Sequence, residues 1–329
     1  MSGEAELFSL LKGVSRSFYI SVRFLPKRIR VTIALGYLLA RATDTVADTN
    51  RLPPAERIQI LQRLLGSVVG CEMRNMGDLA VCLTAQANGP EKVLLRNVQR
   101  VLQFLSAIPR EHRELLNDVL TKIVRGQTLD IERFESGAGI HGLADDSALE
   151  EYTYLVAGSV GEFWTKVCFL EWPGYARLPE AELLVLGKDF GKGLQLINIL
   201  RDYPVDIQAG RSYLPVSNLE EVAANVTLAR PEWERWRRRA LTYLEAAWKY
   251  VTAVRPPRVR FACAVPLFIG VRTLLLLGAE PEIRPGIKVS RKAVRRLVAW
   301  AAGVALFRCL EPYASRKIFR RDFALIAHE

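Results

Sequence analysis

The chain of 329 residues is poor in histidine and cysteine, and this limits the chemistry that it can carry. Its three histidines, His112, His141 and His328, lack the spacing of a metal site or a catalytic triad. The five cysteines are odd in number and include no C-x-x-C pair, which disfavours a disulfide framework and a zinc site and favours a reducing compartment. We therefore expect any catalysis to depend on carboxylates.

Signals for secretion and for crossing a membrane are also lacking. The N-terminus, MSGEAELFSL, carries acidic residues where a signal peptide has positive charge. The nearest approach to a spanning segment, from Phe261 to Gly278, is interrupted by Arg272. We therefore expect a cytoplasmic protein that has no signal peptide and no transmembrane span.

Alternation of apolar and polar residues with a period of two, typical of strands, is scarce. Apolar residues instead recur every three or four positions, for example in KVLLRNVQRVLQFL and AELLVLGKDFGKGLQLINIL. Prolines mark helix starts at Pro53 and Pro54, at Pro109 and at Pro231, and RPPRVR separates two long C-terminal helices. The sequence thus predicts an all-α fold of about ten helices of ordinary length.

The chain shows no sign of division into parts. No low-complexity linker, internal repeat or change of composition interrupts it, so we predict one domain over residues 1–329. The segment ESGAGIHGLADDSA, residues 135–148, is rich in glycine and is predicted to be a loop, either a plain connector or a lid.

Positive charge is in excess, with 46 Lys and Arg against 35 Asp and Glu and a net charge of +11. This charge suits an anionic partner such as a diphosphate, a nucleic acid or an acidic lipid surface. No nucleic-acid-binding motif or aromatic and basic stacking surface is recognisable, so we expect no nucleic-acid partner. The run ERWRRR, residues 234–239, is predicted to form one solvated basic face of a helix.

Two stretches place carboxylates on one face of an apolar helix. Within about 60° of one face lie Tyr37, Arg41, Asp44 and Asp48. Within about 80° of one face of a second helix lie Gln195, Asn198, Asp202 and Asp206. A single D-x-x-x-D pair is common on a solvated helix face, but two such pairs in apolar surroundings need a compensating cation.

Magnesium meets this need, because it binds one or two carboxylates and leaves positions for phosphate oxygens and water. It also allows acidic residues to hold a diphosphate, and it stabilises the charge on a departing diphosphate. Basic residues near the two motifs are expected to offset the remaining phosphate charge: Arg16, Arg41, Lys188, Lys192, Arg201 and Arg211. Pro204 disfavours a regular helix, so Asp206 is expected past a kink and Asp202 is the safer ligand.

Four segments resemble, in the same order, the motifs of the squalene/phytoene synthase family. They are SRSFYISVRFLP (15–26), YLLARATDTVAD (37–48), YTYLVAGSVG (152–161) and LQLINILRDYPVDIQAGRSYLP (194–215). The resemblance covers most of the chain and implies a single-domain, all-α isoprenoid synthase fold with helices around a large central cavity. The segments around the aspartates are more similar to squalene synthases than to phytoene synthases, although Ala47 stands where squalene synthases often carry an acidic residue.

The resemblance implies a Mg²⁺-dependent prenyltransferase that joins two farnesyl diphosphates head to head. The first step would form presqualene diphosphate, and the second would ionise it, rearrange the cation and reduce it with NADPH to squalene. Related alternatives are a phytoene synthase, a dehydrosqualene synthase, or an enzyme that stops at presqualene diphosphate. An alternative of another class is a non-catalytic helical protein that binds lipid or assists assembly.

The resemblance also assigns roles to individual residues. The Mg²⁺ ligands would be Asp44, Asp48, Asp202 and Asp206. Substrate would be bound by Ser15, Ser17, Phe18, Tyr37, Arg41, Gln195, Asn198, Arg201 and Arg211. Tyr152 would assist proton removal or steady a cation, with an ordinary interfacial tyrosine as the alternative. A helix cap and core packing explain Ser15, Ser17, Phe18 and Tyr37 almost as well.

Three further expectations concern packing, cofactor and surroundings. Small residues Ala157, Gly158 and Gly161 would permit close helix packing or leave room for substrate. NADPH rests on the resemblance alone, because no G-x-G-x-x-G motif follows a strand. The apolar segment 295–310 with basic flanks is compatible with peripheral contact with the inner membrane face, or with a buried core helix. No obligate protein partner is expected.

Overall fold

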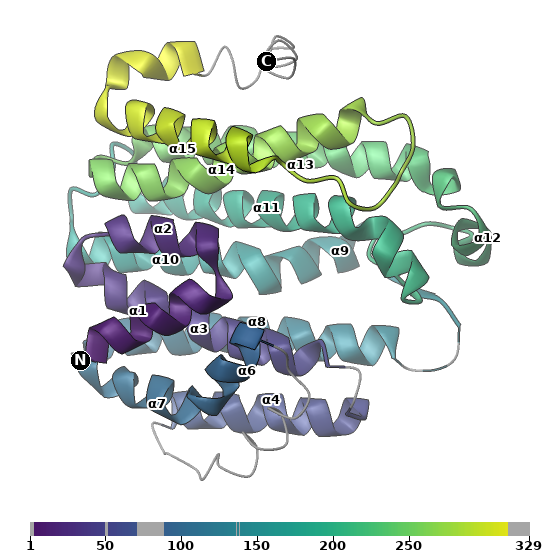
Figure 1. Cartoon of the computed structure of the whole chain (residues 1–329), viewed down its shortest axis with the longest axis horizontal. Coiled ribbons are helices and arrows are strands. Elements are labelled where there is room, and N and C mark those ends of the chain that lie inside the picture. Colours follow the sequence, from purple (N-terminus) through teal and green to yellow (C-terminus); the bar gives the residue numbers. More distant parts are fainter. Residues whose placement is uncertain (1–2, 50–51, 71–88, 136, 138, 315–329) are drawn as a thin grey trace. The chain divides into compact units, whose positions relative to one another are not determined.

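The computed structural model describes residues 3–49, 52–70, 89–135, 137 and 139–314, apart from the side chains of Arg16 and Ser17. Cys71, Cys82 and His328 lie outside these residues. Within the described ranges the chain is helical and contains only two strands of two residues each (Figure 1), so the predicted all-α class is confirmed. The fourteen α-helices of this part exceed the expected ten, because helices of six to eight residues give too short a periodic pattern to be recognised.

Contacts group the chain into two compact units. Unit 1 comprises Met1–Ser136 and Lys166–Glu171, and unit 2 comprises Gly137–Thr165 and Trp172–Glu329. A dense group of contacts is not by itself an independent folding domain. The single domain expected over residues 1–329 therefore stays a prediction.

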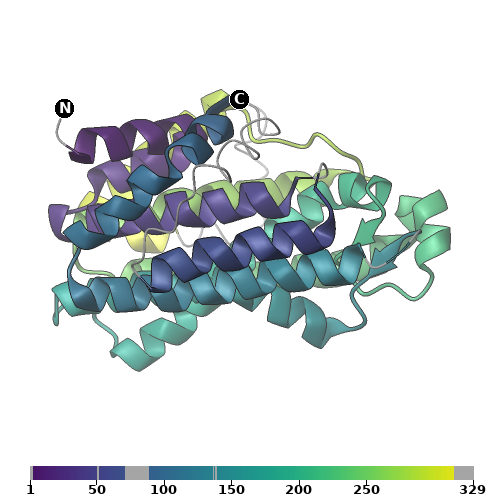
Figure 2. The same ribbon diagram turned by 90° about the horizontal axis from the view of Figure 1, so that it is seen from below.

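Unit 1 is built around α3, which contacts α1, α4, α6, α7 and α8. Its helices are α1 (Gly3–Val14), α2 (Arg16–Phe24), α3 (Lys27–Ala47), α4 (Pro54–Val69), α6 (Gly89–Arg96), α7 (Val98–Gln103) and α8 (Arg110–Phe134), with a 3₁₀ turn η1 (Phe104–Ala107). Pro26, Pro53 and Pro109 directly precede α3, α4 and α8, which confirms the expected proline-marked starts of the last two. Figure 2 shows α3, α4 and α8 running side by side.

A buried histidine joins α8 to α3 within unit 1. His112 is 1% exposed, its Nδ1 lies 2.8 Å from Thr32 Oγ1, and its Nε2 lies 3.2 Å from Glu171 Oε1. Loss of hydration lowers the pKa of His112, and the nearby Glu171 and Glu111 only partly oppose this effect. The neutral imidazole is therefore the form that the fold prefers.

We expect this histidine to make stability depend on pH. Because the pKa of His112 is lower in the folded state, its contribution is complete above the ordinary value of 6.5 and is lost as the pH falls below it. The urea midpoint of the wild type should thus decline more steeply between pH 7.5 and 5.5 than that of His112→Gln. Parallel declines in the two proteins would contradict the assignment.

Unit 2 is built around the long helix α11, which contacts α9, η2, α12, α13 and α14. Its α-helices are α9 (Asp146–Thr153), α10 (Ser159–Glu171), whose last six residues belong to unit 1, α11 (Glu180–Gln208), α12 (Leu219–Ala224), α13 (Arg230–Ala253), α14 (Pro257–Ala279) and α15 (Arg291–Leu306). Shorter turns are the π-helix η2 (Tyr154–Gly158) and the 3₁₀ turns η3 (Val226–Ala229) and η4 (Arg308–Leu310). Pro231 lies at the start of α13, and Pro256 and Pro257 open α14, as expected.

The segment expected as a loop contains a short strand. β1 (His141–Gly142) pairs in parallel with β2 (Arg211–Ser212), and the His141 N–H donates to the Gly210 carbonyl oxygen at 2.9 Å. Gly210 has φ of 80°, a conformation that favours glycine, where the chain leaves α11. Asp145 then caps α9 by accepting a hydrogen bond from Ala148 N–H at 2.8 Å. The segment is thus a connector tied to β2, and α9 begins inside the predicted loop.

Helix α11 continues through Pro204 to Gln208, so Asp206 lies within the same helix, and the kink expected at Pro204 stays a prediction. Proline has no N–H to donate to the carbonyl oxygen four residues earlier, that of Leu200. The Trp233 indole Nε1–H of α13 donates to this oxygen at 3.0 Å in a buried setting. The group left free by the proline is therefore satisfied from another helix.

Replacement of Trp233 by Phe is expected to lower the free energy of unfolding by about 1–3 kcal/mol, because it leaves the buried Leu200 carbonyl without a donor. Trp236→Phe is a matched control. Arg235 lies 5.0 Å from the Trp236 ring, as Arg230 does from the Trp233 ring, but the Trp236 indole donates to the Glu232 carboxylate at 2.8 Å. Urea unfolding should show the larger loss for Trp233→Phe. Equal losses would contradict a special role for the Leu200 carbonyl.

Candidate active site

The first aspartate motif lies at the C-terminal end of α3. This helix buries Leu38, Leu39, Ala42 and Val46, and thereby leaves the predicted polar face toward the other side. Tyr37, Arg41 and Asp44 are half-buried, whereas Asp48 is exposed and is the residue at which the helix ends. The helix prediction for this motif is therefore correct up to Asp48.

Arg41 holds this motif together with a contact from a distant helix. Its Nη1 donates to Asp44 Oδ2 at 2.7 Å, and its Nη2 donates to Glu91 Oε1 of α6 at 2.9 Å. Because the guanidinium is shared between two carboxylates, its orientation is fixed. Glu91 lies 50 residues away in sequence, and no local pattern identified it.

The carboxylates of this motif carry more negative charge than Arg41 offsets. Loss of hydration and then the Asp48 charge raise the pKa of Asp44 to about 6, although Arg41 acts in the opposite direction. A divalent cation would relieve this repulsion, and carboxylate oxygens are ligands that Mg²⁺ accepts. The residues present therefore fit the expected metal.

The N-terminal candidates lie in α2 and beside α3. Ser15 caps α2 by accepting a hydrogen bond from Phe18 N–H at 3.2 Å, and the Phe18 ring stacks on Tyr37 with centroids 4.4 Å apart. These contacts account for a cap and for packing, while a role toward substrate stays a prediction. The side chain of Ser17 lies outside the described part of the structure.

The second motif occupies the C-terminal half of α11. Asn198 Nδ2 lies 3.4 Å from Gln195 Oε1, so these two side chains share a face as predicted. Arg201 contacts Asp202 with two nitrogens, at 2.8 and 2.5 Å, and Asp202 remains half-exposed. One arginine thus accompanies this carboxylate, as Arg41 accompanies Asp44.

Asp206 begins a chain of contacts to Tyr152. The Asp206 side chain is 10% exposed, and its Oδ1 accepts a hydrogen bond from Arg211 Nε at 2.9 Å. The Arg211 guanidinium lies 5.9 Å from the ring centroid of Tyr213, and Tyr213 stacks on Tyr152 at 4.9 Å. The structure therefore brings Tyr152, Arg211 and Asp206 of the predicted site together through Tyr213, which the sequence analysis did not single out.

Two predictions for basic residues can be compared with the contacts. Lys192 Nζ contacts Glu150 of α9, and its role toward phosphate stays a prediction. The solvated basic face predicted for the run 234–239 is present, because Arg235, Arg238 and Arg239 are exposed, although Arg235 and Arg239 also pair with acidic residues of α9. Sequence spacing along α13 could not reveal partners 89 residues away.

The two aspartate motifs belong to different units, Asp44 and Asp48 to unit 1 and Asp202 and Asp206 to unit 2. Among the residues that the structure describes, no three His, Cys, Asp or Glu side chains form a metal-binding group. The four-aspartate Mg²⁺ site and the large central cavity between the motifs therefore stay predictions.

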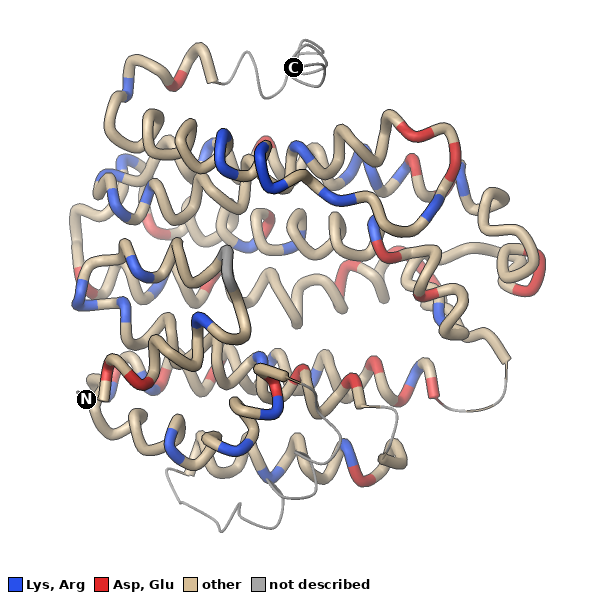
Figure 3. The backbone as a smooth tube through the Cα atoms, in the orientation of Figure 1, with Lys and Arg blue, Asp and Glu red and all other residues tan. Residues whose placement is uncertain are grey.

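One helix of the described part, α14 (Pro257–Ala279), is long and apolar enough to cross a membrane, despite the expectation that Arg272 excludes this. In the structure 67% of its most apolar window is buried, and it packs against α11, α13 and α15. These contacts are those of a core helix. Lys and Arg are distributed over the helices of both units (Figure 3).

Comparison with known proteins gives consistent results. The family model of squalene/phytoene synthase matches residues 11–304. A squalene synthase of Yarrowia lipolytica is 23% identical over 96% of this chain and 71% of its own length. A squalene synthase of Candida albicans is 25% identical over 87% of this chain and 64% of its own length. The chain thus spans about two thirds of the length of these relatives.

Solved structures share the fold. "The complex structure of TcSQS with ligand, E5700" has a TM-score of 0.76 and 21% identity, and covers 93% of this chain and 89% of its own. "Crystal structure of a dehydrosqualene synthase in complex with ligand" has a TM-score of 0.64 and 22% identity, with coverages of 92% and 96%. These likenesses confirm the predicted isoprenoid synthase fold. On the match over residues 11–304, the chain belongs to the squalene/phytoene synthase family.

Proposed function

We propose that this chain joins two molecules of farnesyl diphosphate head to head, forms presqualene diphosphate, and converts it with NADPH to squalene. The observation that supports this most is the repeated design of α3 and α11, in which an aspartate with a partnering arginine stands on each helix. Family membership and relatives named as squalene synthases favour this substrate class.

The proposed roles follow from the chemistry of the side chains. Asp44, Asp48, Asp202 and Asp206 would hold Mg²⁺, which when bound supplies positive charge that favours departure of diphosphate. The guanidinium groups of Arg41, Arg201 and Arg211 already lie beside these carboxylates and can donate to phosphate oxygens. Tyr37, Gln195 and Asn198 would bind substrate from the same helix faces, and Ser15, Ser17 and Phe18 would bind it from the start of α2.

Tyr152 would act on the hydrocarbon part of the substrate. In the first step the carbon–oxygen bond of one farnesyl diphosphate breaks, the double bond of the other forms the new carbon–carbon bond, and closing the cyclopropane releases a proton. One face of the Tyr152 ring is covered by Tyr213, so the ring has a defined orientation. It is thus suited to steady a cation or to assist transfer of that proton.

Product analysis tests the proposal. Purified protein with Mg²⁺ and labelled farnesyl diphosphate should accumulate presqualene diphosphate without NADPH and make squalene with it. Dehydrosqualene is the second candidate product, because the chain is similar to a dehydrosqualene synthase structure. Its formation in place of squalene would overturn the proposed reductive step. Absence of any conversion, with geranylgeranyl diphosphate also inert, would favour the non-catalytic alternative.

We also propose a cytoplasmic protein in peripheral contact with a membrane that exchanges apolar substrate and product. Arg295 and Arg296 of α15 are exposed, and Leu306 and Phe307 at its end are 67% and 58% exposed. This combination suits the surface of anionic lipid. Sedimentation with vesicles of anionic lipid should decrease when both apolar residues are replaced by Ser, and unchanged sedimentation would contradict the contact.

A further inference from the structure

A cluster of charged side chains connects α9 to α11 and α13 within unit 2. Its centre is Glu150, which accepts hydrogen bonds from the Tyr243 hydroxyl at 2.7 Å on both carboxylate oxygens. Arg239 Nε lies 3.4 Å from the same carboxylate, and Lys192 Nζ contacts it as well. We refer to Glu150, Lys192, Arg239 and Tyr243 as the Glu150 cluster.

The Glu150 cluster is enclosed on the side of Lys192, whereas Arg239 is 53% exposed. The side chains of Lys192 and Glu150 are 11% and 25% exposed, and Lys192 and Arg239 each lie about the Tyr243 ring, at 5.1 and 4.8 Å from its centroid. Two cations are thus close together on either side of one carboxylate. If Glu150 lost its charge, the repulsion between Lys192 and Arg239 would be offset less, although Asp189 also lies near Arg239.

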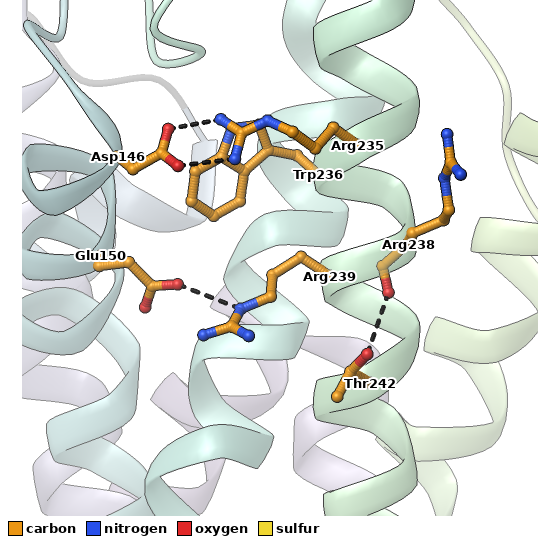
Figure 4. A pocket seen from close by; sticks show the side chains of 7 residues that line it. All are labelled: Asp146, Glu150, Arg235, Trp236, Arg238, Arg239 and Thr242. Atoms are coloured by element: carbon orange, nitrogen blue, oxygen red, sulfur yellow. Dashed lines mark hydrogen bonds and ion pairs between the residues drawn. The ribbon is translucent and has the colours of Figure 1, made fainter.

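A second ion pair binds the start of α9 to α13. Arg235 Nη1 donates to Asp146 Oδ2 at 2.6 Å. Figure 4 shows Asp146 and Glu150 of α9 in contact with Arg235 and Arg239 of α13, and all four side chains line a cavity of about 490 Å³. This face of α9 is therefore held at both ends by opposite charges.

The other face of α9 carries Tyr152. Residues two positions apart point about 160° from each other around a helix, so Glu150 and Tyr152 lie on nearly opposite sides. Tyr152 stacks on the buried Tyr213, whose neighbour Arg211 bonds to Asp206. A shift of α9 away from α13 would thus change the stack that reaches the second aspartate motif.

We propose that Glu150 and Lys192 are positioning residues that hold α9 so that Tyr152 meets Tyr213 and the Arg211–Asp206 pair in the geometry needed for turnover. This inference rests on the proposed function of Tyr152 and goes beyond it. In this inference both residues act through the placement of α9.

The test combines Glu150→Gln with a compensating change. Gln keeps an acceptor for Tyr243 but removes the charge, so we expect kcat with farnesyl diphosphate to fall about 10- to 100-fold while KM changes less than about twofold. Adding Lys192→Met removes one of the two facing cations and keeps much of the aliphatic stem. The double variant should have a kcat at least about threefold higher than that of Glu150→Gln. Glu114→Gln, in the exposed Arg110–Glu114 pair of α8, is the control and should leave kcat unchanged.

A general loss of stability predicts the opposite of rescue. If the double variant is slower than Glu150→Gln, or if Glu150→Gln keeps the wild-type kcat, the inference is overturned. If Tyr152→Phe itself has no effect on turnover, the proposed role of Tyr152 fails instead. In a Tyr152→Phe background Glu150→Gln should cost little more, because the group that it positions is already altered.

A measurement without substrate separates the inference from the proposed function. Amide hydrogen exchange in residues 146–153 and 211–213 should be faster in Glu150→Gln than in the wild type, and Lys192→Met should reverse part of this change. Exchange in α8 should stay the same. Unchanged exchange in α9 would overturn the inference even if the enzyme makes squalene.

Discussion

Replacement of Asp202 by Asn is expected to lower the rate of diphosphate release from farnesyl diphosphate about 100- to 1,000-fold, while the protein stays folded. Asn has nearly the same shape but lacks the charge that would hold Mg²⁺. Asp202 is half-exposed and contacts Arg201, so the folded chain has no buried network to lose at this position. Asp44→Asn should have an effect of similar size. The assay is release of inorganic diphosphate at saturating Mg²⁺.

The control for these variants is Asp118→Asn in α8, because Asp118 also forms an ion pair, with Lys122 at 2.8 Å, but lies outside both motifs. It should release diphosphate at the wild-type rate. The proposed metal roles are wrong if the wild type is active and Asp44→Asn and Asp202→Asn each keep its rate. Activity of the wild type would in turn exclude the non-catalytic alternative.

The sequence predicted the helices that carry the aspartates because their signals are local. Buried residues of α3 such as Leu38, Ala42 and Val46 recur at three and four residue spacing, and the polar residues occupy the remaining face. The same reasoning placed Gln195 and Asn198 together, and these two side chains do lie within 3.4 Å. The helix ends at Asp48, the last aspartate of the predicted motif.

Partners that are distant in sequence could not be predicted in this way. Glu91 orients Arg41 from another helix, and Glu150 of α9 pairs with Lys192 of α11. A charged residue on a helix has the same local pattern whether it meets solvent or an ion on a neighbouring element. Tyr213 lies within the segment 194–215 that resembles the family motif. Its position between Arg211 and Pro215 in the sequence was the signal that could have identified it.

Pro204 illustrates how a tertiary contact overrides a local rule. Proline inside a helix removes one hydrogen bond and commonly bends or breaks it. Here the missing donor is replaced by Trp233, which comes 33 residues after the Leu200 carbonyl that it satisfies. The helix therefore continues to Asp206, which accepts a hydrogen bond from Arg211.

The small residues of the segment 152–161 had two interpretations, and the contacts of unit 2 favour packing. A Cβ atom added to Gly161 would lie 1.8 Å from the carbonyl oxygen of Gly187 in α11. A Cβ on Gly191 would lie 2.1 Å from the carbonyl oxygen of Ala157. Both clashes are with backbone, which cannot rotate away as a side chain can. The lack of a side chain at Gly161 and at Gly191 is thus what allows the segment 152–161 and α11 to approach closely.

We therefore expect Gly161→Ala to lower the free energy of unfolding by about 3 kcal/mol or more, at the upper end for an overfilled core, because α10 and α11 must separate to admit one methyl group. Gly66→Ala is the matched control, since Gly66 lies inside α4 and an added Cβ would meet nothing within 4 Å. It should stabilise by about 0.5–1 kcal/mol, as Ala does for Gly within a helix. Urea unfolding of both variants measures the difference. A small loss for Gly161→Ala would mean that the two helices have space between them, and the glycines would then be better explained as room for substrate.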